Sequence, residues 1–218
     1  MKTNTSAKPA GRPRSFDTSR ALDRALDVFW RKGYEGASLS DLTKAMGINR
    51  PSLYAAFGDK ENLFRRVLDH YAEGPASYSY AALAEPTSRA VVERLLYGTA
   101  DMLTAPRNPH GCLWVQGALA CGNGADPVRK ELISRRMAGE AALRKRLNRA
   151  RIDGDLPPEA NPASLARYIA TIIQGMSIQA AGGATHSELR RIVKIALQSW
   201  PSGETHKKQL GTHPIAGD

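Results

Sequence analysis

The chain has 218 residues, 42% of them hydrophobic, which is enough for one domain of ordinary size or for a small domain joined to a larger one. Lysine and arginine number 31 against 21 acidic residues, and the net charge of +10 suits an anionic partner such as a phosphate backbone. The two cysteines form neither a disulfide framework nor a metal-ligand pattern, so they favour a reducing compartment and predict a cytoplasmic protein.

Helical periodicity runs through most of the chain, and no run of alternating β-branched residues stands out, which predicts an all-α fold of about nine helices. Residues 1–15 are predicted to be a disordered basic arm and residues 201–218 a disordered tail, because both are polar and contain Gly and Pro. A glycine-proline pair at 74–75 breaks the pattern between them. It predicts a small helical unit over 16–73 and a larger one over 74–200.

Three or four helices are predicted within the small unit. The first has an apolar face and ends near Gly33. Ser38 and Asp41 have the spacing of a capping box, with Asp in place of the usual Glu or Gln, and predict the start of the second helix. This helix stops at Gly47, whose freedom to adopt a positive φ allows two short helices to cross.

A short third helix is expected from about residue 49 to residue 57, and a fourth begins after Asp59, which can cap it. Ile48, Leu53 and Phe57 recur at helical spacing and anchor the third helix on the core. The outer face of this helix then presents four side chains: Arg50, Ser52, Tyr54 and Ala55.

Three features over residues 38–63 occur together: a glycine turn at Gly47, Leu-Tyr-x-x-Phe over 53–57, and Lys-Glu-x-Leu over 60–63. This stretch resembles the helix-turn-helix of the TetR/AcrR family of repressors. One departure is Thr43, where the family usually has Ala, and we expect its hydroxyl to bond back to a carbonyl of the preceding turn, that of Leu39.

The resemblance is strong over residues 14–70 and concerns only the architecture beyond them. It implies an N-terminal three-helix, helix-turn-helix DNA-binding domain, followed by a C-terminal helical domain for ligand binding and dimerisation. The implied function is a ligand-responsive transcription repressor that binds a palindromic operator in double-stranded DNA as a homodimer. An unknown small-molecule effector would release it, and an activator of the same fold is an alternative.

A recognition helix of this kind enters the major groove with its N-terminal residues nearest the base edges. Arg50 is the predicted base reader, because a guanidinium can bind guanine O6 and N7 together. Asn49 can read adenine or cap the helix, and Pro51 is tolerated in the first turn.

Ser52, Tyr54 and Lys60 correspond to family positions that hold phosphates, although Tyr54 can instead pack between helices. Arg12 and Arg14 resemble a minor-groove arm, with an ordinary solvated tail as the alternative. The predicted DNA-binding residues are Arg12, Arg14, Ser38, Asn49, Arg50, Pro51, Ser52, Tyr54 and Lys60.

The charge distribution agrees with a basic N-terminal unit. Residues 1–66 contain 13 basic and 7 acidic side chains, a net charge of +6. Residues 127–151 contain nine basic side chains and two glutamates, which indicates a second nucleic-acid surface or, more commonly, the solvated face of a long helix.

The larger unit is expected to contain helices over 88–104, 112–121, 127–151, 163–181 and 186–199. The resemblance implies that the last two, residues 163–199, pair with those of a second copy in a four-helix dimer interface. The longest uncharged run, 168–185, contains polar residues and three glycines, so no membrane partner is expected.

An effector pocket is expected among the helices of the larger unit, where aromatic and methionine side chains line adaptable apolar sites, although the same side chains are often plain core. The candidates are Met102, Leu103, Trp114, Gln116, Met137, Tyr168, Ile172 and Met176. Cys112, at a helix start, is a possible sensor of oxidants or electrophiles, because a helix N-terminus lowers the pKa of a thiol. The alternative is an inert buried cysteine.

Two other classes of function compete with a specific regulator. The five histidines are scattered, and no catalytic, nucleotide-binding or metal-binding motif appears, so we expect no enzyme, no catalytic residue, no metal and no cofactor. A non-specific architectural DNA-binding protein would show little preference between an operator and random DNA.

Overall fold

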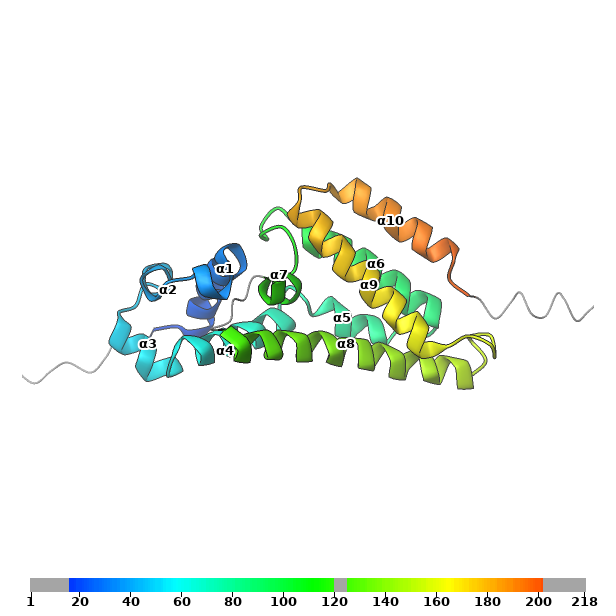
Figure 1. The fold of residues 1–218 in the computed structure, drawn as a ribbon, viewed down its shortest axis with the longest axis horizontal. Coiled ribbons are helices and arrows are strands. Elements are labelled where there is room, and N and C mark those ends of the chain that lie inside the picture. The colour runs from blue at the N-terminus through cyan, green and yellow to red at the C-terminus, as the bar shows by residue number, and fades with distance from the viewer. Residues whose placement is uncertain (1–15, 120–124, 202–218) are drawn as a thin grey trace, which may run out of the picture.

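The computed structural model describes residues 16–119 and 125–201, and within these ranges it consists of ten helices and no strand (Figure 1). The helices are α1 (Thr18–Gly36), α2 (Leu39–Met46), α3 (Arg50–Phe57), α4 (Lys60–Glu73), α5 (Tyr78–Leu83), α6 (Ser88–Thr104), α7 (Leu113–Leu119), α8 (Asp126–Ile152), α9 (Pro162–Ala181) and α10 (His186–Gln198). The all-α prediction is confirmed. The predicted arm with Arg12 and Arg14, the predicted tail after Pro201, and Cys121 lie outside the described residues.

The helices α1–α4 form a small unit at one end of the molecule, which we call the head (Figure 1). Its core is aromatic: Phe29 of α1 and Phe64 of α4 are fully buried, and their rings meet edge to face with centroids 4.9 Å apart. Gly33, with φ of +70°, interrupts α1 where the sequence predicted its end. The chain then makes one further turn, to Gly36, before α2.

The predicted caps of α2 are present. The Ser38 hydroxyl accepts a hydrogen bond from the Asp41 amide at 3.0 Å, and the Asp41 carboxylate accepts one from the Ser38 amide at 3.1 Å. Thr43 Oγ1 donates to the Leu39 carbonyl at 2.9 Å, as expected for this departure from the family pattern. Gly47 ends α2 with φ of +70°, so the turn that precedes α3 needs a residue without a side chain.

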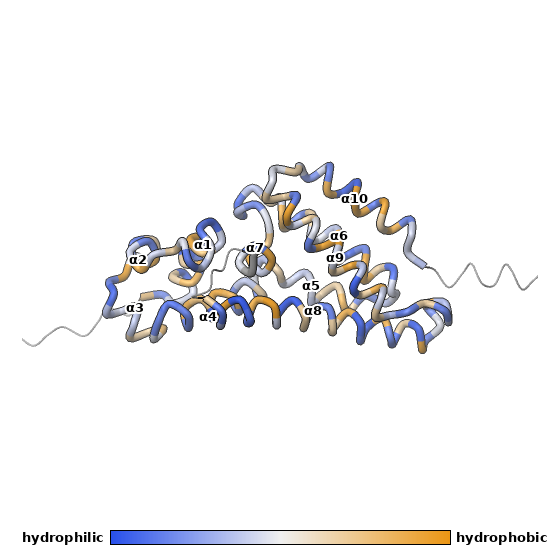
Figure 2. Tube along the Cα trace, in the orientation of Figure 1, coloured by the Kyte–Doolittle hydropathy of each residue, from blue (hydrophilic) through white to orange (hydrophobic). Residues whose placement is uncertain are grey.

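The remaining helices form the larger unit, which we call the body. The long helix α8 packs against α7 and α9, and α10 packs against α6. Figure 2 shows hydrophobic and hydrophilic residues in turn along α8 and α10, as expected for helices with one covered face. The short helix α5 was not predicted, because it has only six residues and Ser77 provides no side-chain cap for it.

The helix α7 lies at the junction between the head and the body (Figure 1). It contacts α1 on one side and α8 and α9 on the other. The indole N–H of Trp30, on α1, donates a buried hydrogen bond of 3.0 Å to the carbonyl of Gly111, just before α7. The head is therefore fixed to the body by a second contact besides α4. No helix in the described part of the chain is long and apolar enough to cross a membrane.

Candidate DNA interface and adjoining cavity

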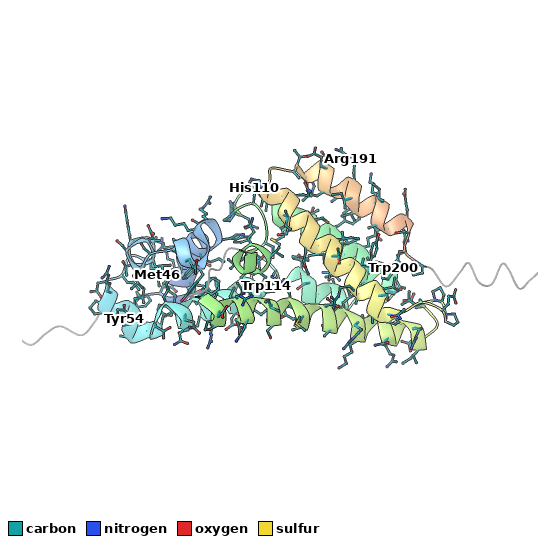
Figure 3. The ribbon with its side chains drawn as sticks, in the orientation of Figure 1. Met46, Tyr54, His110, Trp114, Arg191 and Trp200 are labelled. Atoms are coloured by element: carbon teal, nitrogen blue, oxygen red, sulfur yellow. The ribbon has the colours of Figure 1, made fainter. Side chains whose placement is uncertain are left out.

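The third helix, α3, is short and is fixed from one side. Leu53 and Phe57 are buried and Ile48 is half-buried, as the helical spacing predicted. The guanidinium of Arg66, on α4, lies 5.2 Å from the centre of the Phe57 ring. The opposite face is open: Arg50 is exposed, and 46% of Tyr54 is exposed at the outer end of the head (Figure 3).

The first turn of α3 is organised by Asn49. Its side-chain oxygen accepts the Ser52 amide at 2.8 Å, so the structure assigns Asn49 a capping position. Pro51 lies in the first turn, where its missing N–H costs no helical hydrogen bond. These two residues stabilise the first turn of α3, which contains Arg50. The amide nitrogen of Asn49 remains on an exposed side chain beside it.

Ser38 lies at the start of α2, and its hydroxyl is already engaged. It donates to the Asp41 carboxylate at 2.7 Å while it accepts the Asp41 amide. Lys32 forms an ion pair with the same carboxylate at 2.8 Å, and the hydrogen bonds from Lys32 and Ser38 lower the pKa of Asp41 to about 2. The cap is therefore ionised throughout the physiological range.

Lys60 is the first residue of α4, close after the end of α3. Its Nζ lies 4.5 Å from the centre of the Tyr34 ring, and partial burial lowers the pKa of its ammonium group. Arg24 of α1 donates to the Ala45 carbonyl at 3.1 Å. The second helix is thus tied to α1, and the two helices of the motif are held as one unit.

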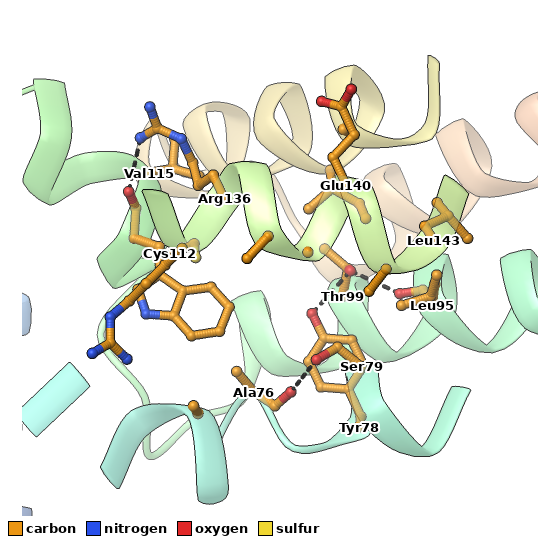
Figure 4. Close-up of a pocket in the computed structure, with 18 of the residues that line it drawn as sticks. Ala76, Tyr78, Ser79, Leu95, Thr99, Cys112, Val115, Arg136, Glu140 and Leu143 are labelled. Carbon is orange, nitrogen blue, oxygen red and sulfur yellow. Dashed lines mark hydrogen bonds between the residues drawn. The ribbon is translucent and has the colours of Figure 1, made fainter. Parts of the chain in front are cut away.

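The body contains a cavity of about 290 Å³ next to the head (Figure 4). Three predicted pocket residues, Met102, Leu103 and Trp114, line it, and so does Cys112. Tyr71, Tyr78 and Thr99 also line it and were not among the predicted residues. The rest of the wall consists mainly of apolar side chains from α5, α6, α7, α8 and α9, including Leu83, Leu95, Val115, Leu143 and Ile173.

Five predicted pocket residues do not line this cavity. Gln116 Nε2 donates to the His110 carbonyl, and Met137 is 64% exposed on the outer side of α8. Tyr168 is 42% exposed, with its hydroxyl 3.3 Å from Ser199 Oγ. Ile172 is half-buried against the core, and Met176 is buried in it. Helical spacing predicts which residues share a face of a helix, but it does not predict whether that face meets the cavity, the core or solvent.

Three hydroxyl hydrogens of the cavity wall are already engaged (Figure 4). The indole N–H of Trp114, another lining residue, is buried without a hydrogen-bond partner. Thr99 Oγ1 donates to the Leu95 carbonyl at 2.7 Å, so the Tyr78 hydroxyl must donate to Thr99, at 3.0 Å. Ser79 Oγ donates to the Ala76 carbonyl at 2.8 Å. Burial raises the pKa of Tyr78 well above its usual value, so its phenol stays neutral.

The charged groups of the lining are paired outside the centre of the cavity. Glu140 accepts from Arg167 at 2.7 Å, and Arg136 donates to the Trp114 carbonyl at 2.9 Å. In Figure 4 the charged ends of Glu140 and Arg136 point away from Tyr78 and Thr99. The cavity therefore presents apolar surface and no unpaired carboxylate among these residues.

Cys112 does not have the environment that its position before a helix predicted. The residue is buried, and desolvation raises the pKa of its thiol above the usual value. The Tyr71 hydroxyl donates to Cys112 Sγ at 3.3 Å and opposes this shift without reversing it. The expectation of a lowered pKa was wrong, because burial outweighs the field of a short helix.

Two family models match the chain. The bacterial regulatory proteins of the tetR family match residues 21–67, and the tetracyclin repressor-like C-terminal domain matches residues 89–200. The HTH-type transcriptional repressor ComR of Escherichia coli (strain K12) is 36% identical over 196 residues, which are 89% of this chain and 93% of ComR. An uncharacterised HTH-type regulator of Bacillus subtilis (strain 168), YezE, is 33% identical over 73% of this chain and 83% of its own length.

Solved structures of TetR-family regulators are also similar to this chain. A cysteine mutant of the TetR family transcriptional regulator CifR, complexed with 26-bp double-strand operator DNA, has 43% sequence identity and a TM-score of 0.83. The alignment covers 87% of this chain and all of the CifR chain. The reduced form of NemR from E. coli has 20% identity and a TM-score of 0.69, which is a likeness of fold.

The buried environment of Cys112 predicts that its thiol reacts slowly with alkylating reagents. In a Cys121→Ser background at pH 7.5, N-ethylmaleimide should modify the folded chain at least about tenfold more slowly than the chain unfolded in guanidinium, because only the thiolate reacts and burial disfavours it. Mass spectrometry of timed samples measures both rates. A folded-state rate equal to or above the unfolded one would contradict this prediction and would favour the cysteine-based sensor.

Proposed function

The chain belongs to the TetR family of bacterial regulatory proteins, and we propose that it is a cytoplasmic, ligand-responsive repressor that binds a palindromic operator as a homodimer. The observation that carries the proposal is the construction of α3: its inner face is anchored by Leu53 and Phe57, while Arg50 and Tyr54 remain free at the end of the molecule. The operator-bound structure of CifR, at 43% identity, supports the same use of the head.

In the proposed complex, the exposed face of α3 enters the major groove. Arg50, in the first turn, reads a guanine through its two parallel N–H donors. Ser52, Tyr54 and Lys60 contact phosphates around it and fix the position of the helix. Asn49 acts mainly by capping α3, because its side-chain oxygen already holds the Ser52 amide.

The proposed dimer interface lies on the outer faces of α9 and α10, within residues 163–199. Ile178, Ile192 and Ile195 are large apolar side chains that remain exposed on these faces. Gly175 is exposed among them on α9, and a Cβ placed there would meet nothing within 4 Å, which leaves room for a close helix contact. Burial of such a face in a second copy would remove apolar surface from water.

Other apolar residues of α9 and α10 do not belong to the proposed dimer interface. Ile169, Met176 and Leu197 are buried within the protomer, where they pack against the other helices of the body. The last two helices therefore serve two cores at once, the one inside the protomer and the proposed one between protomers.

The proposed effector is an uncharged, mainly apolar small molecule that occupies the cavity. The hydroxyl hydrogens of Tyr78, Thr99 and Ser79 are engaged within the protein. A ligand rich in hydrogen-bond acceptors would therefore find few donors beyond the unpartnered indole N–H of Trp114. A cation would also find no unpaired carboxylate, because Glu140 is paired with Arg167. Buried charge without a partner is costly, which disfavours a charged effector.

The first test concerns base reading. An operator is selected from random DNA with the unmodified protein, and Arg50→Ala should then relax the preference at one position of each half-site, at a cost of about 1–3 kcal/mol in binding. Arg151→Ala, an exposed arginine at the far end of α8, is the matched control and should leave the preference unchanged. Equal binding of the unmodified protein to operator and random DNA would contradict the proposal and favour the architectural alternative.

The second test concerns the dimer. Ile195→Glu should shift the protein toward a monomer in analytical ultracentrifugation and weaken operator binding, because it places a charge in the proposed apolar contact. Ile152→Glu is the control, since Ile152 is 78% exposed on α8, away from that contact. Should Ile195→Glu sediment as a dimer like the control, the interface lies elsewhere.

The third test concerns the effector class. Pairs of compounds that share a naphthalene-sized apolar body are compared, one member uncharged and the other carrying a trimethylammonium group. The uncharged member should release the operator at a concentration at least about tenfold lower, because the carboxylate of the lining, Glu140, is already paired with Arg167 and the burial of an unpaired charge is costly. Fluorescence anisotropy of labelled operator measures release, and equal potency within the pairs would refute the proposed class.

A further inference from the structure

We propose that Trp30 transmits the occupation of the cavity to the DNA-reading head, through its hydrogen bond to Gly111 and its ring contact with Tyr71. This inference rests on the proposed function, since it concerns how an effector lowers operator affinity. Trp30 belongs to α1 of the head and does not line the cavity, yet its ring contacts Tyr71 of the cavity wall and its N–H binds the residue just before Cys112 of that wall. It is a positioning residue that acts through its neighbours.

On the side of the body, the acceptor of this hydrogen bond belongs to the segment that precedes α7. Gly111 is buried and has φ of +91°, a conformation that residues with a side chain rarely adopt. The next residue, Cys112, lines the cavity, and its amide donates to Ser177 Oγ of α9 at 2.8 Å. A shift of the wall at Cys112 therefore moves the Gly111 carbonyl, to which Trp30 is bound.

A second contact runs through the buried ring of Tyr71. Its ring lies between two indoles: the centroid of Trp30 is 4.9 Å away at 88°, and that of Trp114 is 5.1 Å away at 81°. Tyr71 and Trp114 line the cavity. Because buried side chains are packed as closely as in crystals, an occupant that displaces either ring presses on Trp30.

On the side of the head, α1 carries the signal to the helix-turn-helix. Arg24 lies six residues before Trp30 on the same helix and donates to the Ala45 carbonyl near the end of α2. Gly47 then leads into α3, so a change in the tilt of α1 is passed to Arg50 by covalent and hydrogen-bonded steps. The alternative is that α4 alone connects the two units, since it runs from Lys60 in the head to Tyr71 at the cavity.

A double-mutant cycle separates these two routes. Ala142→Phe fills the cavity from α8, and loss of binding of the uncharged dye N-phenyl-1-naphthylamine shows that it has done so. Operator affinity is then measured for the unmodified protein, Ala142→Phe, Trp30→Phe and the double variant. We expect Ala142→Phe to weaken operator binding about tenfold or more in the Trp30 background and less than about threefold in the Trp30→Phe background.

Trp200→Phe provides the matched control. Trp200 is also buried, but its indole nitrogen has no hydrogen-bond partner, so the same substitution removes no hydrogen bond. Ala142→Phe should keep its full effect in this background. An equal loss of affinity in the Trp30→Phe background would overturn the role of Trp30 and leave effector-controlled repression intact. If filling the cavity changed operator affinity in no background, both this inference and release through the cavity would fail, whereas operator selection by the unmodified protein would stand.

A second measurement serves if Trp30→Phe does not fold. In a protein with Trp114→Phe and Trp200→Phe, Trp30 is the remaining tryptophan. Ala142→Phe should then shift the emission maximum or the quantum yield of Trp30, because its ring and its hydrogen bond both move. Unchanged emission in a chain whose cavity excludes the dye would overturn the inference.

Discussion

The structure depends on the burial of Tyr71 at the meeting point of the head, α7 and the cavity. Its ring has no exposed surface and lies against Trp30 on one side and Trp114 on the other. Burial raises the pKa of the phenol far above its usual value, so the hydroxyl remains a neutral donor to Cys112. A large side chain fixed in this way prevents the two units from moving independently.

Local patterns in the sequence predicted most of the head. The Ser38–Asp41 capping box, the turn at Gly47 and the anchors Leu53 and Phe57 all follow from spacing within a few residues. The short helix α5 has no such signal, because Ser77 forms no cap and the helix depends on packing against α6.

The cavity could be predicted only in part, since its wall joins residues far apart in the chain. Met102 and Trp114 line it, but Met137 has the same chemical character and faces solvent. Tyr71 lies on the buried face of α4, and no local pattern in the sequence indicates that this face continues into a cavity. For Cys112, the position at the start of a helix predicted a lowered pKa of the thiol. Burial raises this pKa instead, and the burial comes from tertiary packing that the local sequence does not show.

The internal bonding of the cavity hydroxyls also bears on hydration. An apolar cavity whose hydroxyl hydrogens are satisfied by the protein holds water poorly, because a water molecule needs two or more polar partners and the unpartnered indole N–H of Trp114 is only one. A ligand entering such a space displaces little ordered solvent, and its association is then driven by contact enthalpy, with a negative change in heat capacity. Calorimetry of this protein would thus give a different thermodynamic signature from that of a wet, polar site.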